Sequence, residues 1–490
     1  MTTAQNLLVL ISDEHASRYL GCYGHPVVRT PNLDRLAARG TRFTTAYTNC
    51  PICVPARASF ATGRYVHELG NWDNAFPFTG NVPTWADRLR AHGRPVVSIG
   101  KLHYRDDGVL GGFDRTLIPM HVRKGVGDLL GAVRDPLPVR EKTRTLSEEI
   151  GPGESSYTRY DRAITAAAEE WLTEEAPKLE EPWTLYVGLV APHFPLIAPE
   201  EFYALYPPEQ MELPKACRPE DWPRHPWLDA IRECFIWDRF FDDDKRRIAI
   251  ASYFGLCSFL DYNIGRILGA LEKSGAAGRT QILYTSDHGD NLGSRGLWGK
   301  SNAYEESSAI PMIMAGPDIP VGKVVTTPVS LIDLFPTVLD ATGTPAAPED
   351  LELPGRSLLA VATAPDDPDH TVFSEYHAAG AASGMFMLRR GRWKYVFYVG
   401  MRPQLFDLQA DPEELTDLGE RPEHKALLAE FEAELRAICD PEAVDARAKA
   451  DQAALVERMG GRDFVVRRGT FGATPPPEQL GSHAGAAAAP

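Results

Sequence analysis

The sequence predicts an α/β protein with a doubly wound, mostly parallel sheet and a smaller C-terminal antiparallel α+β subdomain. Up to about residue 345, short apolar runs suited to buried strands alternate with longer segments of helical periodicity, an order that builds a parallel sheet covered by helices. Past about Pro354 the pattern changes to short strand-like segments around a turn. A chain of 490 residues is long enough for one large domain and a second, smaller one.

The large domain opens with the continuous apolar run 6–12, which is typical of a central parallel strand buried on both faces. Further strands are expected at 95–99, 183–190, 281–285 and 310–315. Gly40 is expected to close a helix that begins at Pro31 and runs to Arg39. Other helices are expected directly after Cys53 and at 85–92, 157–175, 246–273 and 331–342.

Three short antiparallel strands are expected in the subdomain, at 371–376, 385–389 and 393–398, with Arg390-Gly391-Arg392 as a hairpin turn. An amphipathic helix is expected at 423–438. The expected limits are 1–354 for the large domain, 355–445 for the subdomain and 446–490 for a tail, which from about Gly472 should be extended or disordered. The segment 199–245 is dense in Pro, Trp and acidic residues and is predicted to be an insertion near the mouth of the site.

Composition restricts the possible partners. The net charge of −16, from 51 basic and 67 acidic residues, argues against a nucleic-acid-binding surface. No apolar segment approaches membrane-spanning length, and the first residues lack the basic and apolar regions of a signal peptide. Seven irregularly spaced cysteines fit a reduced compartment better than a disulfide framework. We therefore expect a cytoplasmic protein without a membrane or nucleic-acid partner.

The most informative segment is 53–64, Cys-Val-Pro-Ala-Arg-Ala-Ser-Phe-Ala-Thr-Gly-Arg. Pro55 suits the first turn of a helix, so Cys53 should lie at a helix N-terminus, where backbone N–H groups and the helix dipole favour an anion. Cys53 could instead be a small buried apolar residue. The run Cys50-Pro51-Ile52-Cys53 could also be a redox pair or half of a zinc site, but no second such pair supplies the remaining zinc ligands.

Polar clusters follow four of the expected strands, at the edge where open α/β sheets bind ligands. Asp13 follows the first strand, and Asp287 with His288 follows the strand at 281–285. Carboxylates that converge from two strand ends would bind a hard cation such as Ca²⁺ or Mg²⁺, although either Asp alone could simply cap a helix. The remaining polar residues at this edge are Lys101 and His103, His193 between two prolines, and Lys300.

Together these segments resemble the type I sulfatases of the alkaline phosphatase superfamily, in which the Cys of C-x-P-x-R is oxidised to Cα-formylglycine. Residues 6–13, 53–64, 100–103, 191–195 and 286–300 look like sulfatase motifs in sulfatase order, and the likeness covers most of residues 6–345. The segment 286–298, Asp73-Asn74-Ala75 and the C-terminal subdomain are most similar to choline sulfatases and their bacterial relatives.

The resemblance implies hydrolysis of a sulfate monoester, R–O–SO₃⁻, by a formylglycine hydrate made from Cys53. It implies one divalent cation, Ca²⁺ first with Mg²⁺ or Mn²⁺ as alternatives, and a formylglycine-generating enzyme as a maturation partner. Its cation ligands would be Asp13, Cys53, Asp287 and His288. Arg57 and Lys101 would stabilise the hydrate, of which one hydroxyl attacks sulfur and the other later expels sulfate.

On the substrate side, the resemblance makes His103 the base for the elimination of sulfate and Asn74 a sulfate contact. His193 and Lys300 would bind the sulfuryl oxygens or protonate the leaving group. This chain departs from the family pattern at Glu14, where many sulfatases carry a second Asp, and at 117–121, where choline sulfatases place a Trp suited to a quaternary ammonium. Glu375 could be the carboxylate partner of a cationic substrate or only a strand-edge charge.

Three other functions stay open on the sequence alone. The same scaffold and modified Cys could hydrolyse a phosphonate monoester or phosphodiester, since these tetrahedral esters differ from sulfates mainly in charge. A non-catalytic sulfate- or sugar-binding relative should lack one or more site residues, whereas every required position is occupied. A thiol redox protein would use Cys50 and Cys53 and hold no metal. The subdomain and tail could also pack against a second copy in a homo-oligomer.

Overall fold

The computed structural model describes residues 5–470 and 472–478. Its centre is an eight-stranded sheet with the strand order β11-β2-β10-β9-β1-β7-β4-β5. The four strands β9 (Thr280–Ser286), β1 (Asn6–Asp13), β7 (Thr184–Pro192) and β4 (Val96–Lys101) run parallel beside one another. β10 (Met312–Ala315) is antiparallel to both of its neighbours. The predicted mostly parallel sheet is confirmed.

The strands at the two sides of the sheet were not expected from the sequence. These are β5 (Arg115–Met120) on one side, and β2 (Gly40–Phe43) and β11 (Lys323–Val325) on the other. They are short and mostly lack the continuous apolar run of a central strand. The role expected for Gly40 was wrong: it begins β2, and a Cβ there would lie 2.0 Å from the carbonyl oxygen of Met314, so strand contact requires the glycine.

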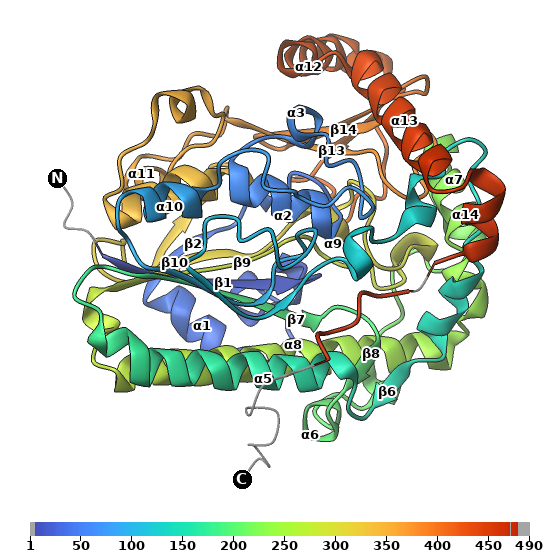
Figure 1. Ribbon diagram of the computed structural model, residues 1–490. Helices are drawn as coiled ribbons and strands as arrows, with labels where there is room; N and C mark the ends of the chain where they lie inside the picture. Colours follow the sequence, from blue (N-terminus) through green and yellow to red (C-terminus); the bar gives the residue numbers. More distant parts are fainter. Residues whose placement is uncertain (1–4, 471, 479–490) are drawn as a thin grey trace.

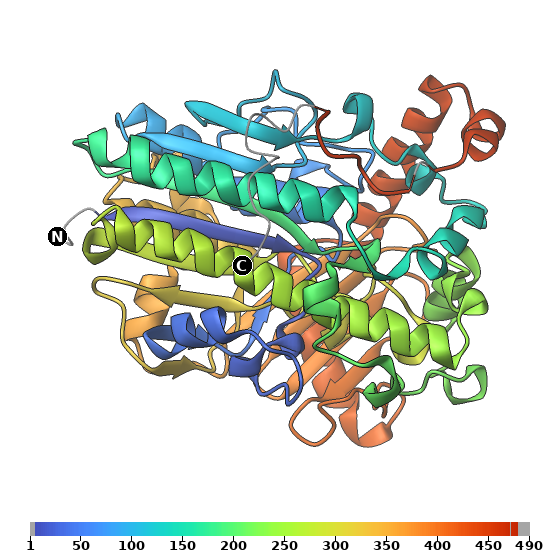
Figure 2. The same cartoon turned by 90° about the horizontal axis from the view of Figure 1, so that it is seen from below.

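Helices cover both faces of the sheet, as the doubly wound prediction requires (Figures 1 and 2). One face carries α1 (Pro31–Ala38), α5 (Ser156–Glu170) and α8 (Asp243–Lys273). The other carries α2 (Cys53–Thr62), α4 (Trp85–Ala91) and α10 (Leu334–Thr342). Leu7, Val9 and Ile11 of β1 pack into one core, and Leu8 and Leu10 pack into the other, which explains the continuous apolar run of this strand.

The subdomain contains a four-stranded antiparallel sheet in the order β13-β14-β15-β16. Its strands are β13 (Thr371–Tyr376), β14 (Met385–Arg390), β15 (Trp393–Tyr398) and β16 (Gln404–Asp407), of which the last was not expected. The tight turn between β14 and β15 contains Gly391 at φ 55°, a left-handed conformation that favours glycine. A third hydrophobic core joins this sheet to Tyr47, Trp72 and Trp227 of the large domain and to α12 (Lys425–Ile438).

The chain beyond residue 445 contains more regular structure than a tail. The expected boundary at 445/446 falls inside α13 (Pro441–Arg458), which is followed by α14 (Arg462–Arg468). The buried positions of α13 include Val444, Ala448, Gln452 and Leu455, a helical spacing whose small and polar members give a weak apolar signal. Residue 471 and residues 479–490 of the expected tail lie outside the described residues, and the domain limits stay a prediction.

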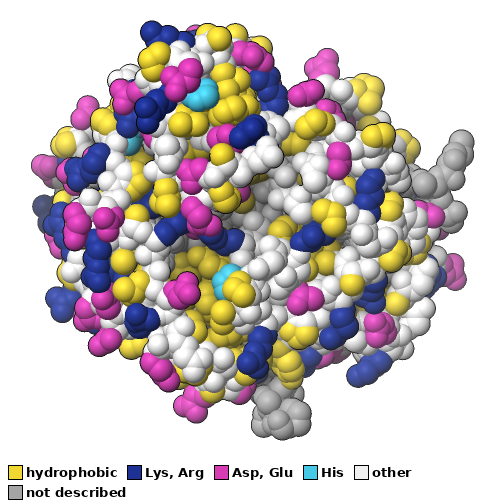
Figure 3. All heavy atoms as spheres, turned by 180° about the vertical axis from the view of Figure 1, so that it is seen from behind, with side chains coloured by type: hydrophobic (Ala, Val, Ile, Leu, Met, Phe, Trp, Pro, Cys, Tyr) yellow, Lys and Arg dark blue, Asp and Glu magenta, His cyan; other side chains and the backbone are white. Residues whose placement is uncertain are grey.

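The surface mixes charges of both signs. On the face seen in Figure 3, Lys and Arg side chains alternate with Asp and Glu rather than gathering in fields of one sign. Among the described residues, no helix combines the length and the apolar character needed to cross a bilayer. The seven cysteines are all free thiols.

Candidate active site

The site lies at the carboxyl ends of the four adjacent parallel strands. β1 ends at Asp13, and Asp287 and His288 follow its neighbour β9, with Ser12 paired to Ser286 in register. On the other side of β1, His193 follows β7 and Lys101 ends β4. At Gly100, φ is 92° and a Cβ would lie 2.4 Å from the Gly188 carbonyl oxygen, so the close approach of β4 to β7 requires glycine. The strand order therefore brings all four predicted polar clusters together.

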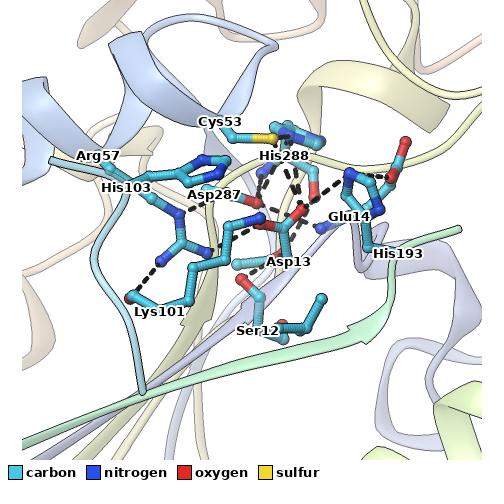
Figure 4. Close-up of polar contacts among 12 residues, drawn as sticks. Ser12, Asp13, Glu14, Cys53, Arg57, Lys101, His103, His193, Asp287 and His288 are labelled. Atoms are coloured by element: carbon cyan, nitrogen blue, oxygen red, sulfur yellow. Dashed lines mark hydrogen bonds and ion pairs between the residues drawn. The ribbon is translucent and has the colours of Figure 1, made fainter. Parts of the chain in front are cut away.

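The Arg57 guanidinium lies below Cys53 and orients the carboxylates of Asp13 and Asp287 (Figure 4). One turn into α2, its Nη2 donates to Asp13 Oδ2 at 3.1 Å and its Nε donates to Asp287 Oδ2 at 2.9 Å. Nη1 donates to the Lys101 carbonyl at 3.1 Å and to the Tyr186 hydroxyl at 3.0 Å. The Lys101 ammonium is 2.5 Å from Asp13 Oδ2. Burial opposes ionisation of Asp13, but Lys101, His193 and Arg57 hold its pKa well below the usual range.

Asp13, Cys53, Asp287 and His288 form a buried group whose ligand-type atoms all lie within 4.8 Å of one another. Cys53 Sγ is 3.2 Å from His288 Nε2 and 3.7 Å from Asp13 Oδ1. His288 Nδ1 faces the Gly289 carbonyl at 3.1 Å, and since a carbonyl only accepts, Nδ1 carries the proton and Nε2 presents its lone pair to the group. Two carboxylates and a correctly oriented imidazole fit one divalent cation.

The Cys53 thiol does not resemble a redox thiolate. Cys53 is the first residue of α2 and is 1% exposed. Burial, together with the Asp13 carboxylate, raises the pKa of the thiol to about 11, whereas reactive redox cysteines have lowered pKa values. Burial also raises the pKa of Cys50.

His193 and Lys300 form a second pair beside Cys53. Lys300 Nζ is 2.9 Å from His193 Nε2 and 3.1 Å from Glu14 Oε2. Burial by itself disfavours the Lys300 cation, but Cys53, Glu14 and Asp13 outweigh it and raise its pKa, so the ammonium stays charged. His193 Nδ1 donates to the Phe194 carbonyl at 2.6 Å, and burial together with Lys300 lowers the pKa of His193, which leaves a neutral ring accepting from Lys300.

Above Cys53 lies a cavity of about 410 Å³, a volume suited to a small ligand. Its lining includes Cys53, Asn74, Lys101, His103, His193 and Lys300, so six of the predicted residues face one space. Asn74 Oδ1 also accepts from the Val54 backbone N–H at 3.1 Å, beside the start of α2. Burial and the Lys101 cation lower the pKa of His103, so this imidazole is neutral and able to accept a proton.

Glu375 is not in this cavity, and its expected role in binding a cationic substrate is not supported by its contacts. It is fully buried in β13, and its Oε1 accepts from the backbone N–H and Nδ1 of His67, both at 2.9 Å. Its Oε2 faces His377 Nε2 at 2.9 Å. Both oxygens are therefore used inside the protein. The sequence left a substrate contact and a strand-edge charge both open for Glu375, and it could not identify these two imidazole partners.

Several cavity residues were missed by sequence reasoning. Tyr157 of α5, Phe194, Phe235 and Trp237 supply aromatic surface, and Thr474 comes from the expected tail. Phe235 and Trp237 belong to the segment 199–245, which was expected to lie near the mouth of the site. Aromatic residues in an irregular segment carry no periodic signal, so only their place in the folded chain identifies them.

Comparisons with known proteins agree with this geometry. A family model described as Sulfatase matches residues 5–344, and one described as N-sulphoglucosamine sulphohydrolase, C-terminal, matches residues 293–440. Choline-sulfatase of Rhizobium meliloti (strain 1021) is 31% identical over 466 residues, covering 92% of this chain and 90% of that protein. Arylsulfatase K of Danio rerio is 30% identical over 444 residues, covering 84% and 80% respectively.

Solved structures share the same fold. The phosphonate monoester hydrolase SpPMH from Silicibacter pomeroyi superposes with a TM-score of 0.71 at 25% identity, over 88% of this chain and 94% of that one. BT4656, solved in complex with its substrate D-glucosamine-2-N,6-O-disulfate, superposes with a TM-score of 0.72 at 21% identity, over 92% and 99%. At this identity the second likeness shows the fold alone.

Proposed function

The chain belongs to the sulfatase family and is a sulfuric ester hydrolase, and from this premise we propose how its own residues hydrolyse a sulfate monoester to an alcohol and sulfate. The observation that carries the proposal is the convergence of Asp13, Asp287 and His288 on Cys53 at the start of α2. The Lys101 and Lys300 cations line the cavity above the same point. An ester anion placed there meets its nucleophile and balancing positive charge together.

Cys53 is the residue that we propose is oxidised to Cα-formylglycine, by a formylglycine-generating enzyme. Its hydrate supplies one hydroxyl for attack on sulfur and a second for the later elimination of sulfate. Asp13, Asp287, His288 and residue 53 would hold the divalent cation, for which Ca²⁺ is our first choice given the oxygen-rich ligand set. When bound, the cation polarises the ester oxygens and acidifies a neighbouring hydroxyl.

The remaining residues orient groups and move protons. Arg57 holds the two carboxylates in place through the bonds described above. Lys300 would place a positive charge near the sulfuryl oxygens and would protonate the departing alcohol oxygen, while the neutral His193 ring accepts from the Lys300 ammonium and orients it. Asn74 would contact the sulfate. His103, neutral and facing the cavity, would accept the proton of the second hydroxyl when sulfate is expelled.

A phosphonate monoester or phosphodiester hydrolase on the same scaffold is the second candidate. The likeness to the Silicibacter pomeroyi enzyme at 25% identity supports it, and both ester types need the same nucleophile and cations. Paired aryl sulfate and aryl phosphonate monoesters with the same leaving group separate the two, since only the transferred group differs. We expect kcat/KM to favour the sulfate.

The maturation of Cys53 is tested by the mass of the tryptic peptide that contains it. In a host that makes formylglycine, the peptide should be about 18 Da lighter than the thiol form, as conversion of a thiol to an aldehyde requires. An unmodified Cys53 from such a host would overturn the mechanism. Metal analysis of the same preparation, beside an Asp287→Asn variant, should find one cation per chain that the variant loses. The cytoplasmic location and a homo-oligomeric state stay predictions.

A further inference from the structure

The last described part of the chain forms a wall of the active-site cavity. After α14, the chain turns back across the large domain toward α5 (Figure 1). Thr470, Gly472, Ala473 and Thr474 all line the same cavity as Cys53 and His103. We call these four residues the C-terminal wall. No periodic pattern in the sequence places this part of the chain at the nucleophile.

Thr474 is held between two side chains of the site. Its Oγ1 is 3.1 Å from His103 Nε2, and its carbonyl oxygen accepts from the Tyr157 hydroxyl at 2.5 Å. The ring of Tyr157 in turn packs edge-on against His193, with centroids 5.7 Å apart. The wall therefore contacts the imidazole assigned to sulfate elimination and adjoins the imidazole that orients Lys300.

The wall has a firm attachment on its N-terminal side. Val465 of α14 is 1% exposed and packs with Leu129, Leu130 and Leu455 in a small separate core. Thr470 is 7% exposed, and its Oγ1 accepts from the Gly472 backbone N–H at 3.1 Å. Gly472 has φ 80°, the left-handed conformation that lets the chain turn there without strain. Ala473 then packs against the core that lies between α5 and the sheet.

We propose, resting on the function proposed above, that the C-terminal wall determines substrate size and that Thr474 is a positioning residue for His103. With the wall in place the cavity measures about 410 Å³, which suits the sulfate ester of a compact alcohol of one ring or less. A sulfated oligosaccharide would need the volume that the wall fills. The Thr474 hydroxyl holds one nitrogen of His103, and among the described residues His103 Nδ1 has no hydrogen-bond partner.

The first test removes the wall. A chain ending at Gly469 retains α13 and α14, and a matched control ending at Glu478 retains every contact described above. We expect truncation at Gly469 to raise kcat/KM for a bulky sulfated oligosaccharide, relative to a compact aryl sulfate, by at least about tenfold, whereas the control keeps the ratio of the full chain. An unchanged ratio in a truncated chain with an unaltered melting temperature would overturn the size assignment.

The second test keeps the wall and changes one hydroxyl. Thr474→Val preserves shape and removes the hydrogen bond to His103, and Thr474→Ser keeps the hydroxyl. We expect Thr474→Val to lower kcat for the compact substrate about fivefold or more with little change in KM, and Thr474→Ser to restore it. Equal kcat for Thr474→Val and the full chain would show that the Thr474 hydroxyl does not position His103.

A third measurement separates failure of this inference from failure of the proposed function. In protein made without formylglycine, alkylation of the Cys53 thiol by a small and by a large thiol reagent is followed on its tryptic peptide. Truncation at Gly469 should accelerate the large reagent more than the small one, whatever the natural reaction is. Equal acceleration of both would show that the wall does not limit size. Selective acceleration here, together with no sulfatase activity in protein that does carry formylglycine, would count against the proposed function alone.

Discussion

Two buried clusters of charge show what distinguishes a site from a structural contact. The first, here called the interface cluster, consists of Lys394 and Glu414 of the subdomain with Glu305, Glu306 and Arg295 of the large domain. Lys394 Nζ is 2.6 Å from Glu305 and 2.7 Å from Glu414, and Arg295 donates to Glu306 at 3.0 Å. Each carboxylate meets a cation, so this cluster is complete as it stands.

The second cluster, around Cys53, is built from the same kinds of residue but is incomplete. Arg57 and Lys101 occupy Oδ2 of Asp13, while its Oδ1 faces Cys53 Sγ and His288 Nε2, three atoms separated by 3.2 to 3.9 Å. The Cys53 thiol supplies one proton, for which Asp13 Oδ1 and the lone pair of His288 Nε2 compete, so one buried acceptor stays unsatisfied unless a ligand completes the group. The comparison teaches that buried polar atoms left without a full set of partners beside a cavity indicate function, whereas buried charge alone does not.

The largest expected effect is on catalysis at residue 53. Cys53→Ala should lower kcat/KM for an aryl sulfate by at least ~10⁴-fold, because no other residue supplies the nucleophile, and should leave the melting temperature nearly unchanged. Cys50→Ala is the control, since Cys50 is equally buried but does not line the cavity. If both variants lost activity together, the redox interpretation would replace ours.

A substitution in the interface cluster should lower the free energy of unfolding rather than the activity. Lys394→Met leaves Glu414 buried without its cation, and removal of one partner from a buried pair costs about 3–5 kcal/mol. Denaturant unfolding measures this, with replacement of the exposed Lys178 by Met as control, for which a change within about 0.5 kcal/mol is expected. The folded variant should retain its kcat/KM. A loss of activity without a loss of stability would contradict the assignment of the interface cluster to a purely structural role.

Replacement of Lys300, unlike that of Lys394, should lower activity. Lys300→Met removes a preorganised cation beside the ester, and the loss of one such group typically costs ~10²–10³-fold in kcat. Stability should fall as well, because Glu14 is fully buried and loses its cation, so the loss of kcat is what separates this variant from Lys394→Met. Steady-state kinetics with a good and a poor leaving group provide the measurement. An effect confined to KM would assign Lys300 to binding alone.

The smallest expected effect concerns Glu375, which should act on stability only. Although burial by itself raises its pKa, His67 and His377 hold the pKa of Glu375 well below its usual 4.5. Glu375 opposes the effect of burial on His67 and raises the pKa of that imidazole above 6.5. Glu375→Gln should therefore lower the free energy of unfolding by roughly 1.5–3 kcal/mol and leave kcat/KM unchanged.

The pH dependence of that loss follows from the signs of the two shifts. A carboxylate with a depressed pKa stabilises the fold above its unfolded pKa of 4.5 and loses this contribution as pH falls. An imidazole with a raised pKa contributes below its unfolded pKa of 6.5 and loses this contribution as pH rises through the folded value. The gap between Glu375→Gln and the parent chain should be widest between about pH 4.5 and 6.5. A gap that is flat from pH 4 to 8 would contradict the pairing with His67.

Much of the fold and of the site was predictable because the signals are local. The apolar run before Asp13 and the strand before Asp287 predicted two carboxylates at one edge of a sheet, and the structure places them on adjacent strands. The helix after Cys53 begins at that residue. By contrast, α13 was missed because its buried face carries few large apolar residues. Glu375, for which a substrate contact and a strand-edge charge both stayed open, is held by His67 and His377.

The sequence by itself predicted the chemistry at residue 53 and determined which residues are available to support it, because a short motif and strand-end polar groups are encoded over a few neighbouring positions. The tertiary structure alone decided which distant residues share one cavity. Thr474 reaches His103 across 371 positions of the chain, and Glu375 turns instead to His67. Such contacts depend on how helices and strands pack over long loops, and periodicity in the sequence records only which face of an element is buried.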